Sequence, residues 1–128
     1  TLSLVRTDIT DEGVPSLLRF SNLKRLFLDD TQVTGDGIRT LLPLQSLETL
    51  SLGAKGIDDD AMPFVSAFPK LRQLYLYRTS ITDKGLIALA PLSRLQYLDC
   101  TGTNVTEAGV KALQLKLPHL RIAWEPNP

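Results

Sequence analysis

The sequence predicts an α/β solenoid, in which short strand–helix units stack along one axis and share a continuous apolar core. Three observations predict it. Leucines return with a period of 24 residues through most of the 128-residue chain. Each unit carries a Leu-x-Leu segment, which is typical of a half-buried strand. A threonine and a glycine then recur at fixed distances after that segment, where a turn and a short helix are expected.

The leucine columns define the register of the repeat. The first column comprises Leu23, Leu47, Leu71, Leu95 and, after 25 rather than 24 residues, Leu120. The second and third columns comprise Leu2, Leu26, Leu50, Leu74 and Leu98, and Leu4, Leu28, Leu52, Leu76 and Cys100. Polar and small residues follow at Thr7, Thr31, Lys55, Thr79 and Thr103, and at Gly13, Gly37, Ala61, Gly85 and Gly109. This alignment predicts one structural unit repeated along the chain.

Each half of the repeat has a physical interpretation. Alternate side chains of Leu-x-Leu point to the same face, so a strand buries both leucines and exposes the residues around them. Consecutive units place these strands side by side in a parallel sheet, about 4.8 Å apart. The segment 85–92 carries apolar residues at Leu86, Leu89 and Leu92 and predicts a short helix. Because one unit cannot bury its apolar face alone, the units are expected to stack.

The pattern LxxLxLxxTxVTxxGLxxLxxLxx resembles the leucine-rich-repeat family along nearly the whole chain. Its core, ITDKGL at 81–86, is similar to the repeats of bacterial (planctomycete-type) proteins and to the cysteine-containing repeats of F-box proteins. The 24-residue period and the Thr in place of Asn or Cys favour the bacterial type. The resemblance implies a right-handed horseshoe with a parallel sheet on its concave side and short helices on its convex side. It also implies a single domain over 1–128, with about five repeats and a C-terminal cap at 117–128.

Composition excludes several classes of function. Lysine plus arginine equals aspartate plus glutamate, 14 against 14, whereas a nucleic-acid binder usually carries a basic stripe, so no nucleic-acid partner is expected. No apolar stretch approaches the roughly 20 residues that span a bilayer, so no membrane partner is expected. Cys100 is the only cysteine and His119 the only histidine, which excludes an internal disulfide and a cysteine-based zinc site. We expect no cofactor, and the lack of disulfides slightly favours a cytoplasmic location.

The acidic run Asp58-Asp59-Asp60 invites interpretation as a metal or carboxylate catalytic site. The repeat register favours a structural role, because residue 58 lies in the column before each helix. Ser, Thr and Asp side chains at such a position accept a hydrogen bond from a helix N–H. That column comprises Thr10, Thr34, Asp58, Thr82 and Thr106. The acids that follow it complement the helix dipole in the first turn, so we predict helix caps and no metal site.

Three further features carry structural expectations. The Thr side chains at 7, 31, 79 and 103 are expected to hydrogen-bond the turn backbone. Lys55 interrupts this column between Gly53 and Gly56, and we predict an irregular loop there with the Lys55 amine in solvent. Cys100 replaces a core leucine and is expected to be buried and inert. The sequence contains no recognisable nucleophile–base–acid set, so no catalytic residue is predicted.

The side chains that alternate with the buried leucines form the candidate binding surface. Phe27, the three tyrosines and Trp124 all fall in these columns. Tyr and Trp beside Arg is the composition of interface hot spots, although neighbouring aromatics also stack on one another along a sheet. For Trp124 we favour a role in covering the end of the solenoid. The predicted partner-binding residues are Arg25, Phe27, Asp29, Tyr75, Tyr77, Arg78, Tyr97 and Asp99.

These features predict a non-catalytic protein–protein interaction module that binds a protein or peptide on its concave sheet face. Two alternatives stay open: the substrate-recognition repeats of an F-box-type ubiquitin ligase, and a structural spacer in a larger protein. The exposed strand face covers on the order of 350 Å², against about 800 Å² per partner in a standard interface. The small face and the apolar edge at Leu2-Ser3-Leu4 indicate a piece of a longer array, or self-association through this uncapped N-terminal edge.

Overall fold

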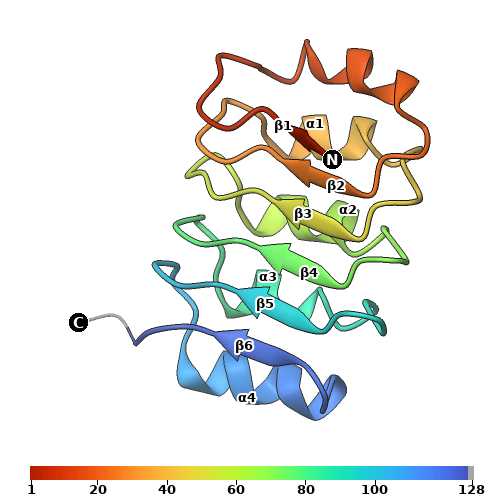
Figure 1. The fold of residues 1–128 in the computed structure, drawn as a ribbon. Coiled ribbons are helices and arrows are strands. Elements are labelled where there is room, and N and C mark those ends of the chain that lie inside the picture. Colours follow the sequence, from red (N-terminus) through yellow and green to blue (C-terminus); the bar gives the residue numbers. More distant parts are fainter. Residues whose placement is uncertain (127–128) are drawn as a thin grey trace.

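The computed structural model, which describes residues 1–126, contains one six-stranded parallel sheet whose strands follow one another in sequence order (Figure 1). The strands are β1 (Leu2–Ser3), β2 (Arg25–Phe27), β3 (Thr49–Ser51), β4 (Gln73–Tyr75), β5 (Tyr97–Asp99) and β6 (Arg121–Ala123). The helices are η1 (Val14–Arg19), α1 (Gly35–Thr40), η2 (Asp59–Ala61), α2 (Met62–Val65), α3 (Asp83–Ile87) and α4 (Glu107–Lys116). The predicted α/β solenoid is confirmed.

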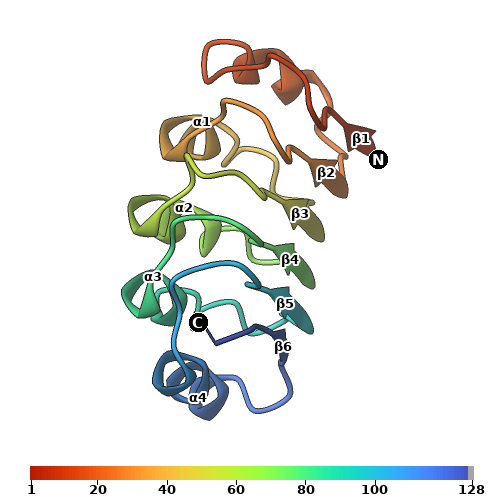
Figure 2. The ribbon, with the colours of Figure 1, turned by 90° about the vertical axis from the view of Figure 1, so that its left-hand side faces the viewer.

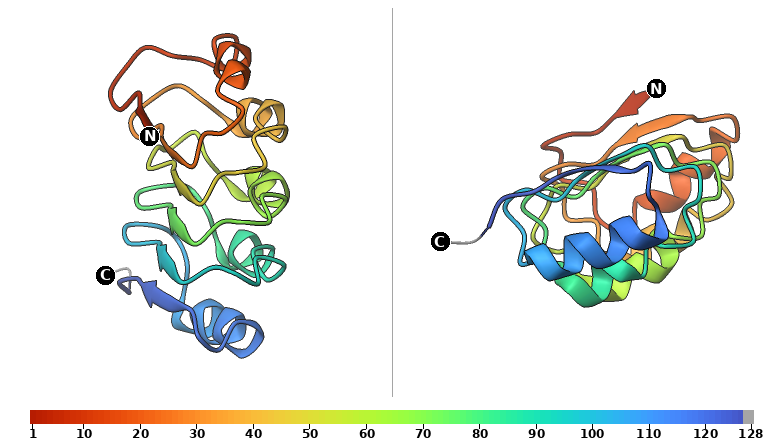
Figure 3. Two further views of the ribbon diagram at one scale, coloured as in Figure 1. Left: turned by 45° about the vertical axis from the view of Figure 1, so that its right-hand side comes forward. Right: turned by 90° about the horizontal axis from the view of Figure 1, so that it is seen from below.

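The strands and helices form two separate layers. Strands occupy the inner side of the stack and helices its outer side (Figure 2). Seen along the stack, each unit is a flattened loop, with the strand on one side and the helix on the other (Figure 3). One face of the sheet therefore packs on the core, and no helix covers the other face.

The core follows the leucine columns. Leu26, Leu50, Leu74 and Leu98 pair in succession across β2 to β5, which gives the sheet the 24-residue register of the sequence. All four side chains are completely buried. Cys100 lies in the next inward column and is also buried, as predicted. Each unit thus contributes one layer to a single continuous core.

The last strand departs from the predicted register by one residue. β6 pairs Ile122 with Leu98 and Ala123 with Asp99, so the 24-residue spacing continues in the strands although Leu120 follows Leu95 by 25 residues. Trp124 therefore occupies the column after Cys100 and packs against the core. Its predicted placement among the outward aromatics is wrong, whereas the expectation that it covers the end of the core is confirmed. The predicted cap over 117–128 includes Asn127 and Pro128, which lie outside the described residues.

The threonine column stabilises the turns, as predicted. The hydroxyls of Thr7, Thr31, Thr79 and Thr103 each donate to the backbone carbonyl three residues earlier, at 2.6–2.7 Å. The turn in front of each of these threonines has a left-handed residue; these residues are Arg6, Asp30, Arg78 and Gly102. Ala54 holds this position in the remaining unit without that conformation, and the turn lies instead at Lys55 and Gly56. Lys55 is exposed, so the irregular loop is confirmed.

The helix caps match the prediction in three of five units. The side chain of Asp58 accepts from the backbone N–H of Asp60, and Thr82 and Thr106 cap α3 and α4 in the same way. Thr10 does not cap a helix, because η1 begins after Gly13. Thr34 precedes α1 without accepting a capping bond, since its hydroxyl donates to Asp11 of the preceding unit.

The bond from Thr34 to Asp11 belongs to a contact that recurs between units, which we call the Asp–Thr clamp. In each clamp an aspartate accepts from both the backbone N–H and the hydroxyl of a threonine 23 residues later, at 2.5–2.8 Å. The pairs are Asp11 with Thr34, Asp59 with Thr82, and Asp83 with Thr106. The aspartates predicted to complement helix dipoles therefore also join neighbouring units.

The glycine column makes room for these clamps. A Cβ atom added at Gly85 would lie 2.2 Å from Oδ1 of Asp59, and one at Gly109 would lie 2.0 Å from Oδ1 of Asp83. One interface lacks the clamp and changes at all three positions together. There the acid is replaced by Gly35, the threonine by Asp58 and the glycine by Ala61.

Candidate functional site on the concave sheet face

The strands point Arg25, Phe27, Tyr75, Tyr97 and Asp99 away from the core, as the alternation predicts. Arg25 is exposed, and the other four side chains are half-buried by their neighbours. All five lie on the sheet face that no helix covers. This face is the surface on which the sequence placed a binding site.

Two tyrosines and an arginine form a continuous group over β4, β5 and β6. The Tyr75 and Tyr97 rings lie 5.7 Å apart between centroids and are tilted by 55°. The guanidinium carbon of Arg121 lies 5.5 Å from the centre of the Tyr97 ring. Arg121 was not among the predicted residues, because the one-residue error in the last unit had placed Ile122 in this column. The corrected register shows that it extends the group.

A second, smaller group lies on β2. The guanidinium carbon of Arg25 is 5.7 Å from the centre of the Phe27 ring. Between Phe27 and Tyr75 lies β3, whose outward residues Thr49 and Ser51 are small and buried. The sheet face therefore presents two aromatic–arginine groups separated by one strand of small polar side chains.

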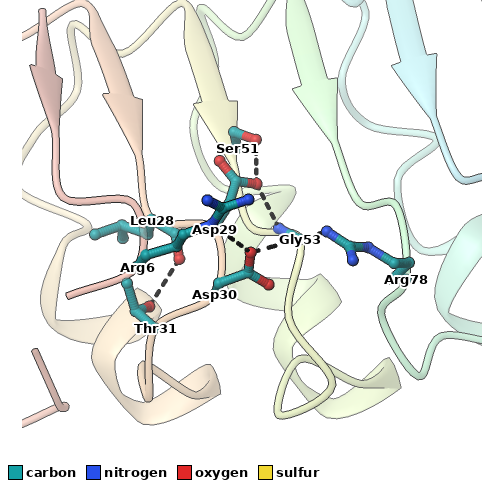
Figure 4. Close-up of polar contacts among 8 residues, drawn as sticks. All are labelled: Arg6, Leu28, Asp29, Asp30, Thr31, Ser51, Gly53 and Arg78. Atoms are coloured by element: carbon teal, nitrogen blue, oxygen red, sulfur yellow. Dashed lines mark hydrogen bonds and ion pairs between the residues drawn. The ribbon is translucent and has the colours of Figure 1, made fainter. Parts of the chain in front are cut away.

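Asp29 differs from the prediction. It was expected as a partner-binding group, but only 4% of it is exposed. Its Oδ1 accepts hydrogen bonds from the Ser51 hydroxyl at 2.5 Å and from the Gly53 N–H at 2.8 Å (Figure 4). Because the carboxylate is occupied by the next strand, Asp29 holds the sheet together where β2 and β3 end.

Tyr77 reaches back over Gly53 towards Asp29. A Cβ atom on Gly53 would lie 2.6 Å from Cε2 of Tyr77, so only glycine leaves room for the ring. Burial raises the pKa of Tyr77, and the hydrogen bond to Asp29 and the negative charge of Asp29 raise it further. Tyr77 is therefore held inside the protein at its hydroxyl end. A glycine between a large aromatic residue and an aspartate in one column was the sequence signal for this contact.

Arg78 belongs to an exposed charged group at the turns. Its guanidinium carbon lies 5.2 Å from the centre of the Tyr77 ring, and its Nη2 lies 3.8 Å from Oδ2 of Asp30. Arg6 contacts the same Asp30 oxygen at 3.7 Å (Figure 4). Arg6, Asp30 and Arg78 all have left-handed backbone conformations, with φ of 55–58°. Sequence reasoning missed Arg6 and Asp30, since neither lies in a strand column.

Asp99 is also partly occupied within its own turn. Its Oδ1 accepts from the N–H and the hydroxyl of Thr101, at 3.0 and 2.9 Å. Of the eight predicted residues, Asp29, Tyr77, Arg78 and Asp99 therefore take part in internal contacts at the ends of the strands. Arg25, Phe27, Tyr75 and Tyr97 remain as the part of the prediction that presents aromatic and cationic groups outward.

The site contains no arrangement that points to a metal. Within residues 1–126, no group of three or more His, Cys, Asp or Glu side chains is placed to hold a metal ion. Within the same residues, no helix has both the length and the apolar character that a membrane span requires.

Comparison with known proteins identifies the repeat. A family model described as "Leucine Rich repeat" matches residues 69–90, which run from the end of α2 to the end of the α3 unit. Internalin C2 of Listeria monocytogenes has a solved structure that superposes with a TM-score of 0.75 and 27% identity over 98% of the chain. The chain is a leucine-rich-repeat protein. No curated protein matches its sequence at a significant level.

Other solved leucine-rich-repeat structures share the fold. A leucine-rich-repeat protein of Leptospira interrogans gives a TM-score of 0.69 at 22% identity over 94% of this chain, and another internalin of Listeria monocytogenes gives 0.64 at 15% identity over 98%. This leucine-rich-repeat chain spans 51%, 30% and 41% of the three matched chains, in the order given. Leucine-rich-repeat proteins are generally binding modules, which is consistent with an uncovered sheet face.

Proposed function

We propose that this leucine-rich-repeat chain is a non-catalytic protein–protein interaction module, which binds a protein or peptide on its concave sheet face. The observation that carries the proposal is the group formed by Tyr75, Tyr97 and Arg121 on three adjacent strands. Aromatic rings and arginines supply most of the binding energy in typical interfaces. Packing of the strands on the core does not require them on this face.

The size of the face favours an extended segment of the partner. The strand face covers on the order of 350 Å², less than half of the roughly 800 Å² that one partner contributes to a standard interface. A peptide or loop lying across β2 to β6 fits such a surface. A globular partner would also have to contact the loops beside the strands.

A paired substitution tests the proposal. Tyr75→Ala with Tyr97→Ala removes both rings from the outer face without touching the leucine core. A matched control is Ile87→Ala with Leu115→Ala, which truncates two exposed apolar side chains in the helix layer. Each tagged protein is used to capture partners from a lysate of its source, and captured proteins are purified and titrated by calorimetry. We expect the affinity for the purified partner to fall at least about tenfold for the tyrosine pair, as for typical hot-spot residues.

The control pair is expected to bind like the wild type. If the tyrosine pair also binds the purified partner with unchanged affinity, the concave face is not the binding surface. If no protein is captured by any variant, the chain acts as a spacer between other parts of a larger protein.

A further inference from the structure

The charged residues of this neutral chain are separated between the two edges of the sheet. All strands are parallel, so the loops that enter them share one edge and the loops that leave them share the other (Figure 1). We call the entering side the basic edge; it comprises residues 19–25, 43–49, 67–73, 91–97 and 116–121. It carries eight cationic residues and one acid, Glu48; the cations are Arg19, Lys24, Arg25, Lys70, Arg72, Arg94, Lys116 and Arg121.

The opposite edge has the reverse composition. The segments 5–12, 29–36, 53–60, 77–84 and 101–108 carry eleven acids and four cations. The zero net charge of the chain therefore hides two edges of opposite sign. A composition-based argument against a basic stripe averages over this separation.

Helix stabilisation explains only part of the basic edge. Acids at helix starts and cations at helix ends complement the helix dipole within the first and last turn. Arg19 and Lys116 occupy last turns of helices and fit this explanation. Arg72 and Arg94 lie beyond the helices, in the loops that lead into β4 and β5. Their charge is not needed to stabilise a helix.

The basic edge is most uniform towards its C-terminal end. On its N-terminal half, Glu48 contacts Lys24 at 3.7 Å and Arg72 at 3.9 Å. Beyond Arg72 the edge contains no acid up to residue 121. Lys70, Arg94 and Lys116 are exposed, and none has an ion-pair partner among residues 1–126.

This part of the edge also contains a hollow. Its volume is about 370 Å³, and it is lined by Arg72, Ser93, Arg94, Leu95, Gln96 and His119. Two guanidinium groups beside hydroxyl, amide and imidazole donors suit a carboxylate, because arginine binds carboxylates through paired charge-assisted hydrogen bonds. The hollow lies beside the strand starts, so a partner can occupy it without displacing the residues of the concave face.

We propose that the C-terminal half of the basic edge binds an acidic segment of a partner protein, with a carboxylate in the hollow between Arg72, Arg94 and His119. The stretch from β3 to β6 spans about 15 Å, which four or five residues of an extended peptide cover. Charge complementarity is the argument for this occupant. A nucleic acid is less suited, because domains that bind it usually have a pI above about 9, whereas this chain has a pI near 6.5. This surface is separate from the proposed concave site, and neither proposal depends on the other.

An NMR titration tests this proposal with a defined probe. An octaglutamate peptide is added to the ¹⁵N-labelled protein at low salt, with a glycine–serine peptide of equal length as the neutral control. We expect amide shift changes to concentrate at residues 70–73, 93–97 and 119–121 and not at 53–60. The apparent affinity should fall several-fold when the salt is raised to about 0.3 M, since exposed ion pairs are screened.

Two double variants with the same net charge locate the effect. Arg72→Gln with Arg94→Gln removes two cations from the basic edge, and Lys55→Gln with Lys84→Gln removes two exposed cations from the opposite edge. We expect the first pair to weaken octaglutamate binding at least about fivefold, as for the loss of several exposed ion pairs, and the second to leave it unchanged. Far-ultraviolet circular dichroism checks that both variants are folded.

Three results would overturn the proposal. The first is an octaglutamate affinity that is absent, or equal in the two double variants. The second is tighter binding of an eight-nucleotide oligothymidylate with the same dependence on Arg72 and Arg94, which would make the edge a nucleic-acid site. The third is concentration-dependent self-association, measured by sedimentation without peptide, that the Arg72 and Arg94 substitutions abolish; the acidic edge of a second copy would then be the occupant.

Discussion

Cys100 shows how one position in the repeat acquires its chemistry from its column. It replaces a core leucine, is buried, and its thiol donates to the Ala123 carbonyl at 3.4 Å. Burial, and then the negative charge of Asp99, raises the pKa of this thiol to about 12. The thiolate is therefore disfavoured in the folded protein, and Cys100 is an inert core residue rather than a nucleophile.

The raised pKa of Cys100 predicts a loss of stability in alkali. Below pH 9 the thiol is protonated in both states and its ionisation does not affect folding. Above the ordinary value of 9.0 the unfolded thiol ionises first, so its contribution falls as pH rises towards the folded pKa, approaching about 1.4 kcal/mol per pH unit. Urea unfolding at pH 7 to 10.5 measures it, with Cys100→Ala as the control for other groups. Parallel pH profiles for the two proteins would contradict the prediction.

At the residue scale, the sequence predicted which side chains leave the core but not what they contact. Alternation along a strand is enough to place Tyr75 and Tyr97 outward. It cannot tell that the Asp29 carboxylate is satisfied by Ser51 and Gly53, or that Tyr77 reaches across two strands. Such contacts depend on the lengths of neighbouring side chains and on a missing Cβ, which a column-by-column alignment does not represent.

At the scale of the repeat unit, the Asp–Thr clamp explains the spacing of the motif. The aspartate at the start of one helix fills the space that a side chain would need at the glycine of the next unit. In the interface that lacks it, a Cβ at Gly35 would lie 3.2 Å from the Cβ of Ala61. Asp58 also stands where a threonine would donate its hydroxyl, so an acid at residue 35 would face a second carboxylate. The three exceptions are therefore one change.

Gly85→Ala tests the clamp against a matched glycine. The new methyl group would overlap the Asp59 carboxylate, which is held in place by Thr82. We expect the free energy of unfolding to fall by about 1–3 kcal/mol, as for an overpacked site. Gly56→Ala is the control, because its Cβ would meet nothing closer than 3.7 Å and should change stability by less than about 0.5 kcal/mol. Equal effects in urea unfolding would show that the close contact is relieved at no cost.

At the scale of the molecule, the chain is a stack in which each strand pairs only with its neighbours. Stability in such a protein is approximately a sum of terms for units and for the contacts between adjacent units. The last unit contacts only one neighbour, and Trp124 covers its core. The sequence predicted this cap from its position, although the outward column assigned to it was wrong by one residue. That error arose because the extra residue before Leu120 is absorbed before the strand begins, which leucine spacing alone does not show.

Trp124→Ala should therefore loosen one end of the stack more than the other. We expect faster hydrogen exchange of the Cys100 amide, which donates to Ala123, by about tenfold or more for the partial loss of a large side chain. The Leu28 amide, which donates to Ser51, lies in the other half of the stack and should exchange at the wild-type rate. Exchange measured residue by residue by NMR distinguishes the two, and equal acceleration at both would mean that the molecule opens as a single unit.

The Asp–Thr clamp also limits how a chain of this kind can lengthen by gene duplication. The segment from Asp83 to Thr106 begins with the acceptor of one clamp and ends with its donor, and Gly85 supplies the space. A tandem copy of this segment would meet itself with the same complementary parts. The segment from Gly35 to Asp58 begins without the acceptor and ends without the hydroxyl. Boundaries that keep an aspartate and the following threonine in one cassette are therefore the natural recombination points of this fold.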